Sequence, residues 1–126
     1  MQKILLGLHR KILAQSILQT MKEDKRFDCY IENCPVNIPL AIQKYDIDIA
    51  VIEVPESGSN PEGEKLAICR EIADTSPNCK LLLMCSEESE SCKKAIVEAK
   101  RRGEIEDFVF YDSSLEYLIA KLESMK

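Results

Sequence analysis

The sequence predicts an α/β fold: one domain over residues 1–126, in which a doubly wound parallel sheet of five strands forms the middle of three layers. Three observations support this prediction. A chain of 126 residues is long enough for one hydrophobic core but short for two. Five short apolar runs alternate with five segments whose apolar residues recur every three to four positions. Right-handed crossovers between parallel strands place such helices on both faces of the sheet.

The first three elements are predicted from a change of period. Residues 3–8 form a continuous apolar run that ends in glycine and basic residues, which is typical of a strand buried on both faces. Residues 10–23 carry apolar side chains at helical spacing with polar residues between them, which predicts an amphipathic helix. Residues 28–32 form a shorter and more polar strand, and this mixed polarity favours the edge of the sheet.

A short helix and the central strand come next. Asn37 before an early Pro39 predicts a helix N-terminus, with the helix continuing through Tyr45. Residues 47–54 are the most β-branched run of the chain, which predicts a central strand. Residues 55–61 are rich in turn formers and indicate a loop at the carboxyl end of that strand.

The helical period resumes at residue 62, and Pro77 marks the end of this third helix. Residues 81–85 are aliphatic and predict a fourth buried strand. Residues 86–91 are polar and indicate a loop. The fourth helix follows, with Gly103 expected just beyond its last turn, where glycine is the usual residue.

The last two elements are a strand at 108–111 and a C-terminal helix. The strand is aromatic and β-branched. Ser113 and Glu116 have the spacing of a capping box, in which each side chain bonds a free backbone N–H of the first turn. This pattern predicts that the final helix begins just after Ser113 and continues through the apolar residues up to Leu122.

Charge is distributed unevenly along the chain. The 17 basic and 22 acidic residues give a net charge of −5, which argues against a nucleic-acid-binding or anionic-membrane surface. Residues 1–22 contain no acid and four bases, so 13 bases face 22 acids in the remainder, a local net charge of −9. No apolar run approaches the length that spans a bilayer, and no secretory signal is evident at the start, so we expect a cytoplasmic protein.

Six cysteines raise the question of a metal site or disulfides. No two of them have C-x-x-C spacing, and the single histidine, His9, is far from all of them in sequence. We therefore expect reduced, mostly buried thiols. The six are Cys29, Cys34, Cys69, Cys79, Cys85 and Cys92.

Function in a doubly wound fold is expected where the strands end, at the carboxyl edge of the sheet. The loop after the first strand is Leu8-His9-Arg10-Lys11. It lacks the Ser/Thr/Gly-rich phosphate loop that an FMN-binding flavodoxin needs. It also lacks the cysteine that a sugar-transport subunit of the IIB type carries there. Neither of these functions is favoured.

Two local patterns resemble a third family. The stretch DIAVIEVPESG at 48–58 and the stretch DFVFYDSSLE at 107–116 are similar to the central strand and the last strand-helix junction of a response-regulator receiver domain. The order and lengths of the elements agree over residues 3–124. The resemblance implies the flavodoxin-like topology with strand order 2-1-3-4-5, and a place in two-component, phosphorelay signal transduction.

The positions that carry the chemistry of that family differ in this chain. The resemblance implies an aspartate that accepts a phosphoryl group at the end of the third strand, and this chain has Glu53 there. It implies two acids that bind Mg²⁺ after the first strand, where this chain has Leu8 and His9. Mg²⁺ prefers hard oxygen ligands, which neither of these side chains supplies. We therefore expect no cofactor and no metal.

Two further positions of the family's pocket also differ. A Thr or Ser after the fourth strand matches Cys85, or Ser86 one residue later, and the lysine after the fifth strand matches Tyr111. A tyrosine hydroxyl is neutral near pH 7, so it cannot replace an ammonium in neutralising a transferred phosphoryl group. Glu53 also reaches one methylene further than aspartate, which disturbs in-line attack.

These departures predict a degenerate receiver, or pseudo-receiver, that is not phosphorylated on aspartate and acts as a protein-interaction module. Glu53 either pairs with Arg10 or Lys11 as a structural carboxylate, or stands in permanently for the phosphorylated side chain. The first alternative function is a phosphotransfer-competent regulator with a non-standard acceptor. A small enzyme using His9 and Glu53 is a weaker alternative, and we expect no enzyme activity. For Cys85, strand packing is favoured over a reactive thiolate.

The resemblance also implies a docking surface. In receivers, the fourth helix, fifth strand and fifth helix bind an output domain, a sensor kinase or a second copy, and Tyr111 and Tyr117 could anchor a partner there. The basic runs at 93–94 and 100–102 are expected on this fourth helix, where nearby acids favour a solvated mixed-charge face. The expected partner is thus a protein, with no nucleic acid and no membrane.

Overall fold

A computed structural model describes residues 2–8, 10–23, 25–53, 61–85, 90–110 and 115–125, except for the side chains of 35, 61–67, 91 and 92. Strands and helices alternate along the chain, as the sequence predicted. In order they are β1 (Gln2–Gly7), α1 (Lys11–Lys22), β2 (Phe27–Ile31), the 3-10 turn η1 (Pro35–Asn37), α2 (Ile38–Tyr45), β3 (Ile49–Glu53), α3 (Pro61–Thr75), β4 (Lys80–Cys85), α4 (Glu90–Arg101), β5 (Asp107–Phe110) and α5 (Leu115–Ser124).

The five strands form one parallel sheet in the order β2-β1-β3-β4-β5. This confirms the doubly wound, flavodoxin-like topology, with β3 in the centre and β2 at one edge. The register pairs Gly7 with Ile52, Glu53 with Met84, and Cys85 with Phe110. All strands therefore end at the same edge of the sheet, which is where the candidate site was expected.

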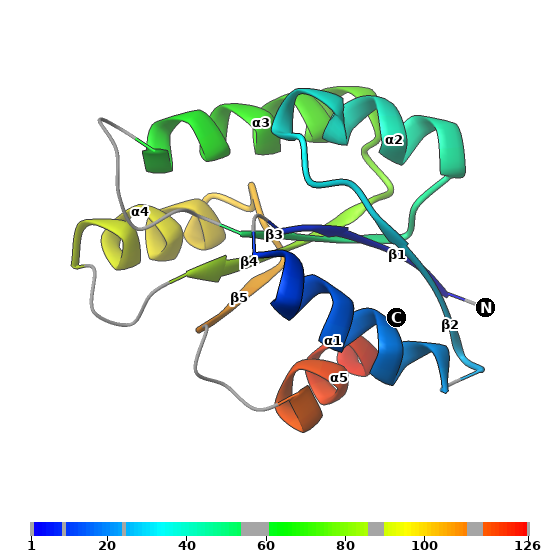
Figure 1. Cartoon of the computed structure of the whole chain (residues 1–126). Coiled ribbons are helices and arrows are strands. Elements are labelled where there is room, and N and C mark those ends of the chain that lie inside the picture. Colours follow the sequence, from blue (N-terminus) through cyan, green and yellow to red (C-terminus); the bar gives the residue numbers. More distant parts are fainter. Residues whose placement is uncertain are drawn as a thin grey trace.

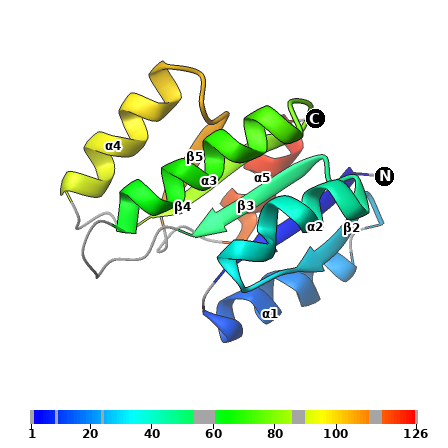
Figure 2. The same cartoon turned by 90° about the horizontal axis from the view of Figure 1, so that it is seen from above.

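Helices cover both faces of the sheet (Figure 1). Layer one consists of α2, α3 and α4, and layer two of α1 and α5, with α2 at the outer side of its layer beside β2 (Figure 2). Each layer encloses its own buried cluster. One contains Leu5, Ile52 and Leu83 from the sheet with residues of α2, α3 and α4, and the other contains Leu6 and Val51 with residues of α1 and α5. Side chains that alternate along each strand point into the two clusters, so both faces of the sheet are apolar.

Two helix ends use a left-handed residue. Gly103 has φ +78°, and the N–H groups of Gly103 and Glu104 donate to the carbonyls of Lys100 and Ala99. This is the Schellman arrangement, and it confirms the predicted role of Gly103. α2 ends in a related way at Asp46, the other described residue with positive φ, at 56°.

Most strand and helix ends lie within two residues of the sequence prediction, and the starts of α4 and α2 show two differences. α4 begins at Glu90 rather than after residue 91. Asn37 precedes α2 as predicted, but it does not cap the helix with its side chain. Its backbone (φ −89°, ψ −7°) is already helical because the turn η1 leads directly into α2, and its amide Nδ2 instead donates to Glu32 Oε1 at 3.4 Å. Of the predicted loops at 55–61 and 86–91, residues 55–60 and 86–89 lie outside the described residues, as does the Ser113 half of the capping box, and Pro61 is already the first residue of α3.

Candidate functional site

The candidate site lies where β1, β3, β4 and β5 end. In the register of the sheet, Glu53 is the last residue of β3, one position beyond the pairing of Ile52 with Gly7. Cys85 is the last residue of β4, beside Phe110 at the end of β5. The sheet therefore brings the carboxyl ends of four strands together, although they are far apart in sequence (Figure 1).

Glu53 is held at the centre of this edge. Only 3% of the residue is exposed, although it is charged. Arg10 contacts both of its carboxylate oxygens: the backbone N–H of Arg10 donates to Oε1 at 3.4 Å, and the guanidinium Nε lies 3.4 Å from Oε2. Arg10 is the residue just before α1, so its backbone N–H and the positive end of the helix both favour a carboxylate here. The sequence offered Arg10 and Lys11 as partners of Glu53, and this ion pair is formed by Arg10.

The other two described site residues, Leu8 and Cys85, are buried in apolar surroundings. Leu8 is 1% exposed and packs in the cluster under α1 and α5, while Cys85 is fully buried in the cluster under α2, α3 and α4. Leu8 thus serves the core and offers no ligand atom to the edge of the sheet. Burial of Cys85 agrees with the prediction of strand packing. His9, Ser86 and Tyr111 lie outside the described residues.

Within the ranges that the structure describes, no three His, Cys, Asp or Glu side chains come together as a metal site would require. The five cysteines with described side chains are all reduced thiols. Burial raises the pKa of Cys29 to about 11 and that of Cys79 to about 12, with Asp28 and Asp48 respectively adding to the effect. Both thiols are therefore protonated at neutral pH and unsuited to nucleophilic chemistry.

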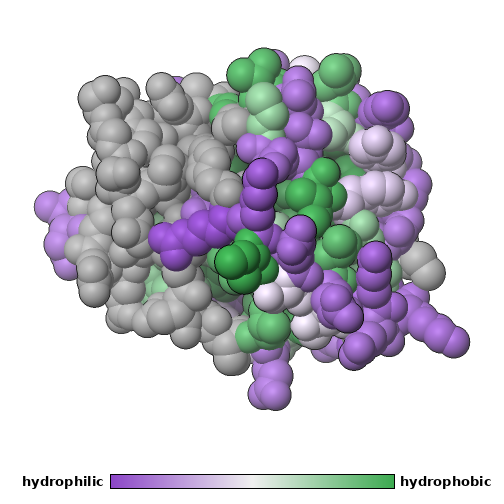
Figure 3. Space-filling view, in the orientation of Figure 1, coloured by the Kyte–Doolittle hydropathy of each residue, from purple (hydrophilic) through white to green (hydrophobic). Residues whose placement is uncertain are grey.

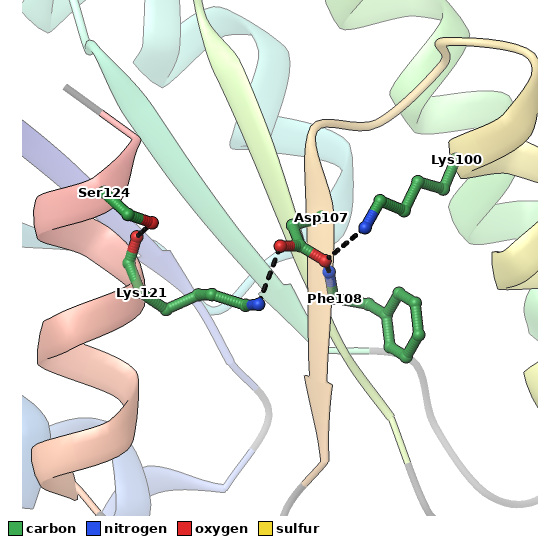
Figure 4. A network of polar contacts seen from close by, with 5 residues as sticks. All are labelled: Lys100, Asp107, Phe108, Lys121 and Ser124. Atoms are coloured by element: carbon green, nitrogen blue, oxygen red, sulfur yellow. Dashed lines mark hydrogen bonds and ion pairs between the residues drawn. The ribbon is translucent and has the colours of Figure 1, made fainter.

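A second charged cluster joins α4, β5 and α5, and the sequence did not predict it (Figure 4). Asp107, at the start of β5, accepts from Lys121 at 2.8 Å and from Lys100 at 3.1 Å, and also from the N–H of Phe108 at 2.8 Å. Burial of the carboxyl raises its pKa, but these hydrogen bonds outweigh it, so the pKa of Asp107 is lowered. The hydrogen bond that Lys121 donates to Asp107 raises the pKa of Lys121 in turn. Asp107 and Lys121 are 14 residues apart in sequence, so local sequence patterns do not predict this contact.

The basic runs on α4 are paired with acids, as the sequence indicated. Arg101 and Arg102 both contact Glu98, at 3.4 and 3.7 Å, and Arg102 also contacts Glu104. Lys93 lies 3.4 Å from Glu90. These side chains form a mixed-charge helix face, which is the solvated surface that the sequence favoured.

Comparisons with known proteins identify the fold. No protein-family model matches the sequence, and no curated protein matches it significantly. Solved structures do match. A DNA-binding response regulator of the LuxR family from Staphylococcus aureus has a TM-score of 0.80 at 14% identity, over 99% of this chain and 98% of that chain. A response regulator from Thermotoga maritima has a TM-score of 0.79 at 15% identity, over 98% and 96%.

The isolated receiver (REC) domain of RcsB from Salmonella enterica, whose structure contains the phosphomimetic BeF3−, has a TM-score of 0.74 at 12% identity, over 98% of this chain and 88% of that domain. At such low identity the likeness establishes the fold, which is the fold of response-regulator receiver domains. No helix in the described part of the chain is both long and apolar enough to cross a bilayer.

Proposed function

We propose that this chain is a degenerate receiver domain of two-component signalling, which does not use aspartyl phosphorylation and acts as a cytoplasmic protein-interaction module rather than as an enzyme. The observation that carries the proposal is the buried ion pair between Glu53 and Arg10 at the end of the central strand. In the resemblance to receivers, Glu53 stands where the phosphate-accepting aspartate would be.

The described residues at this edge do not fit Mg²⁺. An octahedral Mg²⁺ site needs several hard oxygen ligands. Leu8 stands at one of the two metal-binding positions of the family and packs in the core instead. Arg10 engages both oxygens of Glu53. A metal approaching Glu53 would meet a guanidinium cation already in place, and the Coulomb repulsion between the two opposes binding.

The pairing of Glu53 with Arg10 also supports a site whose charge does not depend on phosphorylation. A phosphorylated aspartate places extra negative charge at the end of the central strand and needs a nearby cation to register it. Here a carboxylate is always present, and Arg10 supplies the cation from the start of α1. We infer that the domain holds one conformation and binds its partner without a phosphorylation signal.

The partner is proposed to be a protein: an output domain, a sensor kinase or a second copy of the chain. The family-like surface of α4, β5 and α5 exposes about half of Val97 and half of Tyr117, and the Asp107 cluster fixes the spacing of its three elements. An exposed tyrosine such as Tyr117 on a rigid face is a typical anchor of a protein interface.

The proposal is tested by phosphorylation and by metal binding. The protein is incubated with acetyl phosphate and Mg²⁺ and analysed by intact-mass spectrometry, together with the Glu53→Asp and Glu53→Gln variants. We expect no phosphoryl adduct on any of them, and no saturable chemical-shift changes at residues 8–10 and 53 in an NMR titration with Mg²⁺. An adduct on the wild type that disappears in Glu53→Gln would establish the alternative, a phosphotransfer-competent regulator with Glu53 as acceptor. An adduct on Glu53→Asp alone would show that the rest of the pocket is intact and would refute the degenerate site.

A further inference from the structure

Exposed apolar side chains gather around the edge of the sheet that β2 forms. Four of the seven large hydrophobic residues that are exposed in the described part of the chain lie within residues 31–45. They are Ile31, Val36, Leu40 and Tyr45. Figure 3 shows apolar atoms along the upper side of the molecule, where Figure 1 places α2. Such a local concentration marks an interaction site more often than isolated exposed residues do.

The most exposed of these side chains lie outside the hydrophobic core. α2 already buries Ile38, Ala41 and Ile42 against the sheet. Val36 is 84% exposed and Leu40 is 65% exposed, and the two are four residues apart on the continuous turn that η1 and α2 form. They therefore lie next to each other on the outer side of α2. Figure 2 shows that α3 flanks α2 on one side only, and α2 forms the outer margin of its layer.

Charges of opposite sign mark the two ends of this apolar pair. Glu32 lies at the amino-terminal end, where its carboxylate accepts from Asn37 at 3.4 Å. Lys44 lies in the last turn of α2, with its ammonium 5.4 Å from the ring centroid of Tyr45. The order along the outer side is thus acid, Val36, Leu40, base.

This order is self-complementary. If two copies meet about a two-fold axis with their α2 helices antiparallel, Val36 of one copy faces Leu40 of the other. The same operation brings Glu32 of each copy toward Lys44 of the second copy. An isologous interface needs a patch of this kind, since each part of the surface must match another part of itself. Antiparallel helices also place the positive end of each helix dipole beside the negative end of the other.

We propose that the outer side of α2, formed by Glu32, Val36, Leu40 and Lys44, is a docking surface for a second copy of this chain. The helix has 8 residues and so offers about 12 Å of length, which makes a small interface. The dimer is therefore weak and depends on protein concentration. This inference is independent of the proposed function, because the surface lies away from Glu53 and from the α4–β5–α5 face.

The oligomeric state tests the proposal. Sedimentation equilibrium of the purified protein, from micromolar to millimolar concentration, is expected to show a reversible monomer–dimer equilibrium. Leu40→Glu places a carboxylate in the apolar centre and is expected to raise the dimer dissociation constant about tenfold or more. Ile12→Glu is the matched control, because Ile12 is also an exposed aliphatic residue on a helix but belongs to α1. It is expected to leave the equilibrium unchanged, and circular dichroism verifies that both variants fold.

Charge reversal tests the antiparallel arrangement itself. Lys44→Glu and Glu32→Lys each place like charges together and are expected to weaken the dimer, while the double variant restores the opposite pairing and regains most of the affinity. A protein that is monomeric at every concentration would overturn the proposal. So would a dimer that a Val97→Glu change on α4 disrupts and Leu40→Glu does not, because the contact would then lie on the α4–β5–α5 face. A double variant weaker than both single variants would reject the antiparallel packing.

Discussion

Among the described residues, Glu53 is the one charged or polar side chain that is almost fully buried. A carboxylate loses favourable hydration when it is buried, and the folded state must replace it. The N–H and guanidinium of Arg10 provide part of that replacement. The stability of the folded chain should therefore depend on these two residues jointly rather than separately.

A double-mutant cycle measures this dependence. Arg10→Ala removes the guanidinium and leaves the buried carboxylate, so we expect it to lower the free energy of unfolding by about 1–2 kcal/mol. In a Glu53→Gln background, where no charge is buried, the same change should cost less, which gives a coupling energy of about 1 kcal/mol in urea denaturation. Lys11→Ala, which removes the next cation along the chain, is the control and should not couple to Glu53→Gln. Equal costs of Arg10→Ala in both backgrounds would show that the ion pair contributes nothing to stability.

At the scale of elements, the two helices that end in a left-handed residue allow a reciprocal test. Gly103 (φ +78°) has open space where a Cβ would be, so an added methyl group strains the backbone and meets no neighbour. Asp46 adopts φ +56° with a side chain present. We expect Gly103→Ala to lower the free energy of unfolding by about 1 kcal/mol and Asp46→Gly to raise it by about 0.5 kcal/mol. The free energy of unfolding of Gly103→Asn should lie between those of the wild type and Gly103→Ala, because asparagine tolerates the left-handed conformation better than alanine does.

Thermal and urea unfolding of the three variants check this order. If Gly103→Asn and Gly103→Ala were equally destabilising, the cost would come from the side chain and not from the left-handed backbone. If Asp46→Gly destabilised the protein, then the carboxylate of Asp46 would stabilise α2 by more than its backbone conformation costs.

At the scale of the whole molecule, periodicity was enough to predict the layers but not the contacts between them. Residues 3–8 are mostly apolar and residues 47–54 are the most β-branched run, which is typical of strands buried between two helix layers, and the strands formed there, β1 and β3, lie next to each other inside the sheet. Gly103 was predicted because a helix end is a local event. The edge position of β2 followed from its polar residues.

Contacts that depend on the strand order were harder to predict. Arg10 and Glu53 are 43 residues apart, and the sequence could offer Arg10 only as one of two candidate partners. Asp107 binds one lysine from each neighbouring helix, and no local pattern pairs them. The cap at Asn37 failed for a related reason: the 3-10 turn before α2 changed the backbone conformation on which a side-chain cap depends.

The Asp107 cluster links three elements and should make the stability of the whole domain depend on pH. Because pairing with Lys121 and Lys100 holds the pKa of the Asp107 carboxyl below its ordinary value of about 3.9, the unfolded chain takes up this proton first as the pH falls. The stabilisation is therefore fully present above about pH 4 to 5 and is lost as the pH falls through the lowered pKa. At alkaline pH the stabilisation is fully present below the ordinary lysine pKa of about 10.4 and is lost as the pH rises through the pKa of Lys121, which the same pairing raises.

The measurement compares the wild type with Asp107→Asn in urea denaturation between pH 2.5 and 8, a range set by the ordinary aspartate pKa of about 3.9. Near pH 7 we expect the variant to be less stable by about 1 kcal/mol, since partly exposed ion pairs contribute this much at most. The difference should shrink toward zero at the acid end of the range. There Asp107 of the wild type is protonated, and the side chains of wild type and variant can both still accept the hydrogen bond from Phe108 N–H. Asp74→Asn, at an exposed site on α3, is the control and should show no comparable change. A difference between wild type and Asp107→Asn that stays constant with pH would mean that Asp107 stabilises the domain through its shape and hydrogen bonds, and not through its charge.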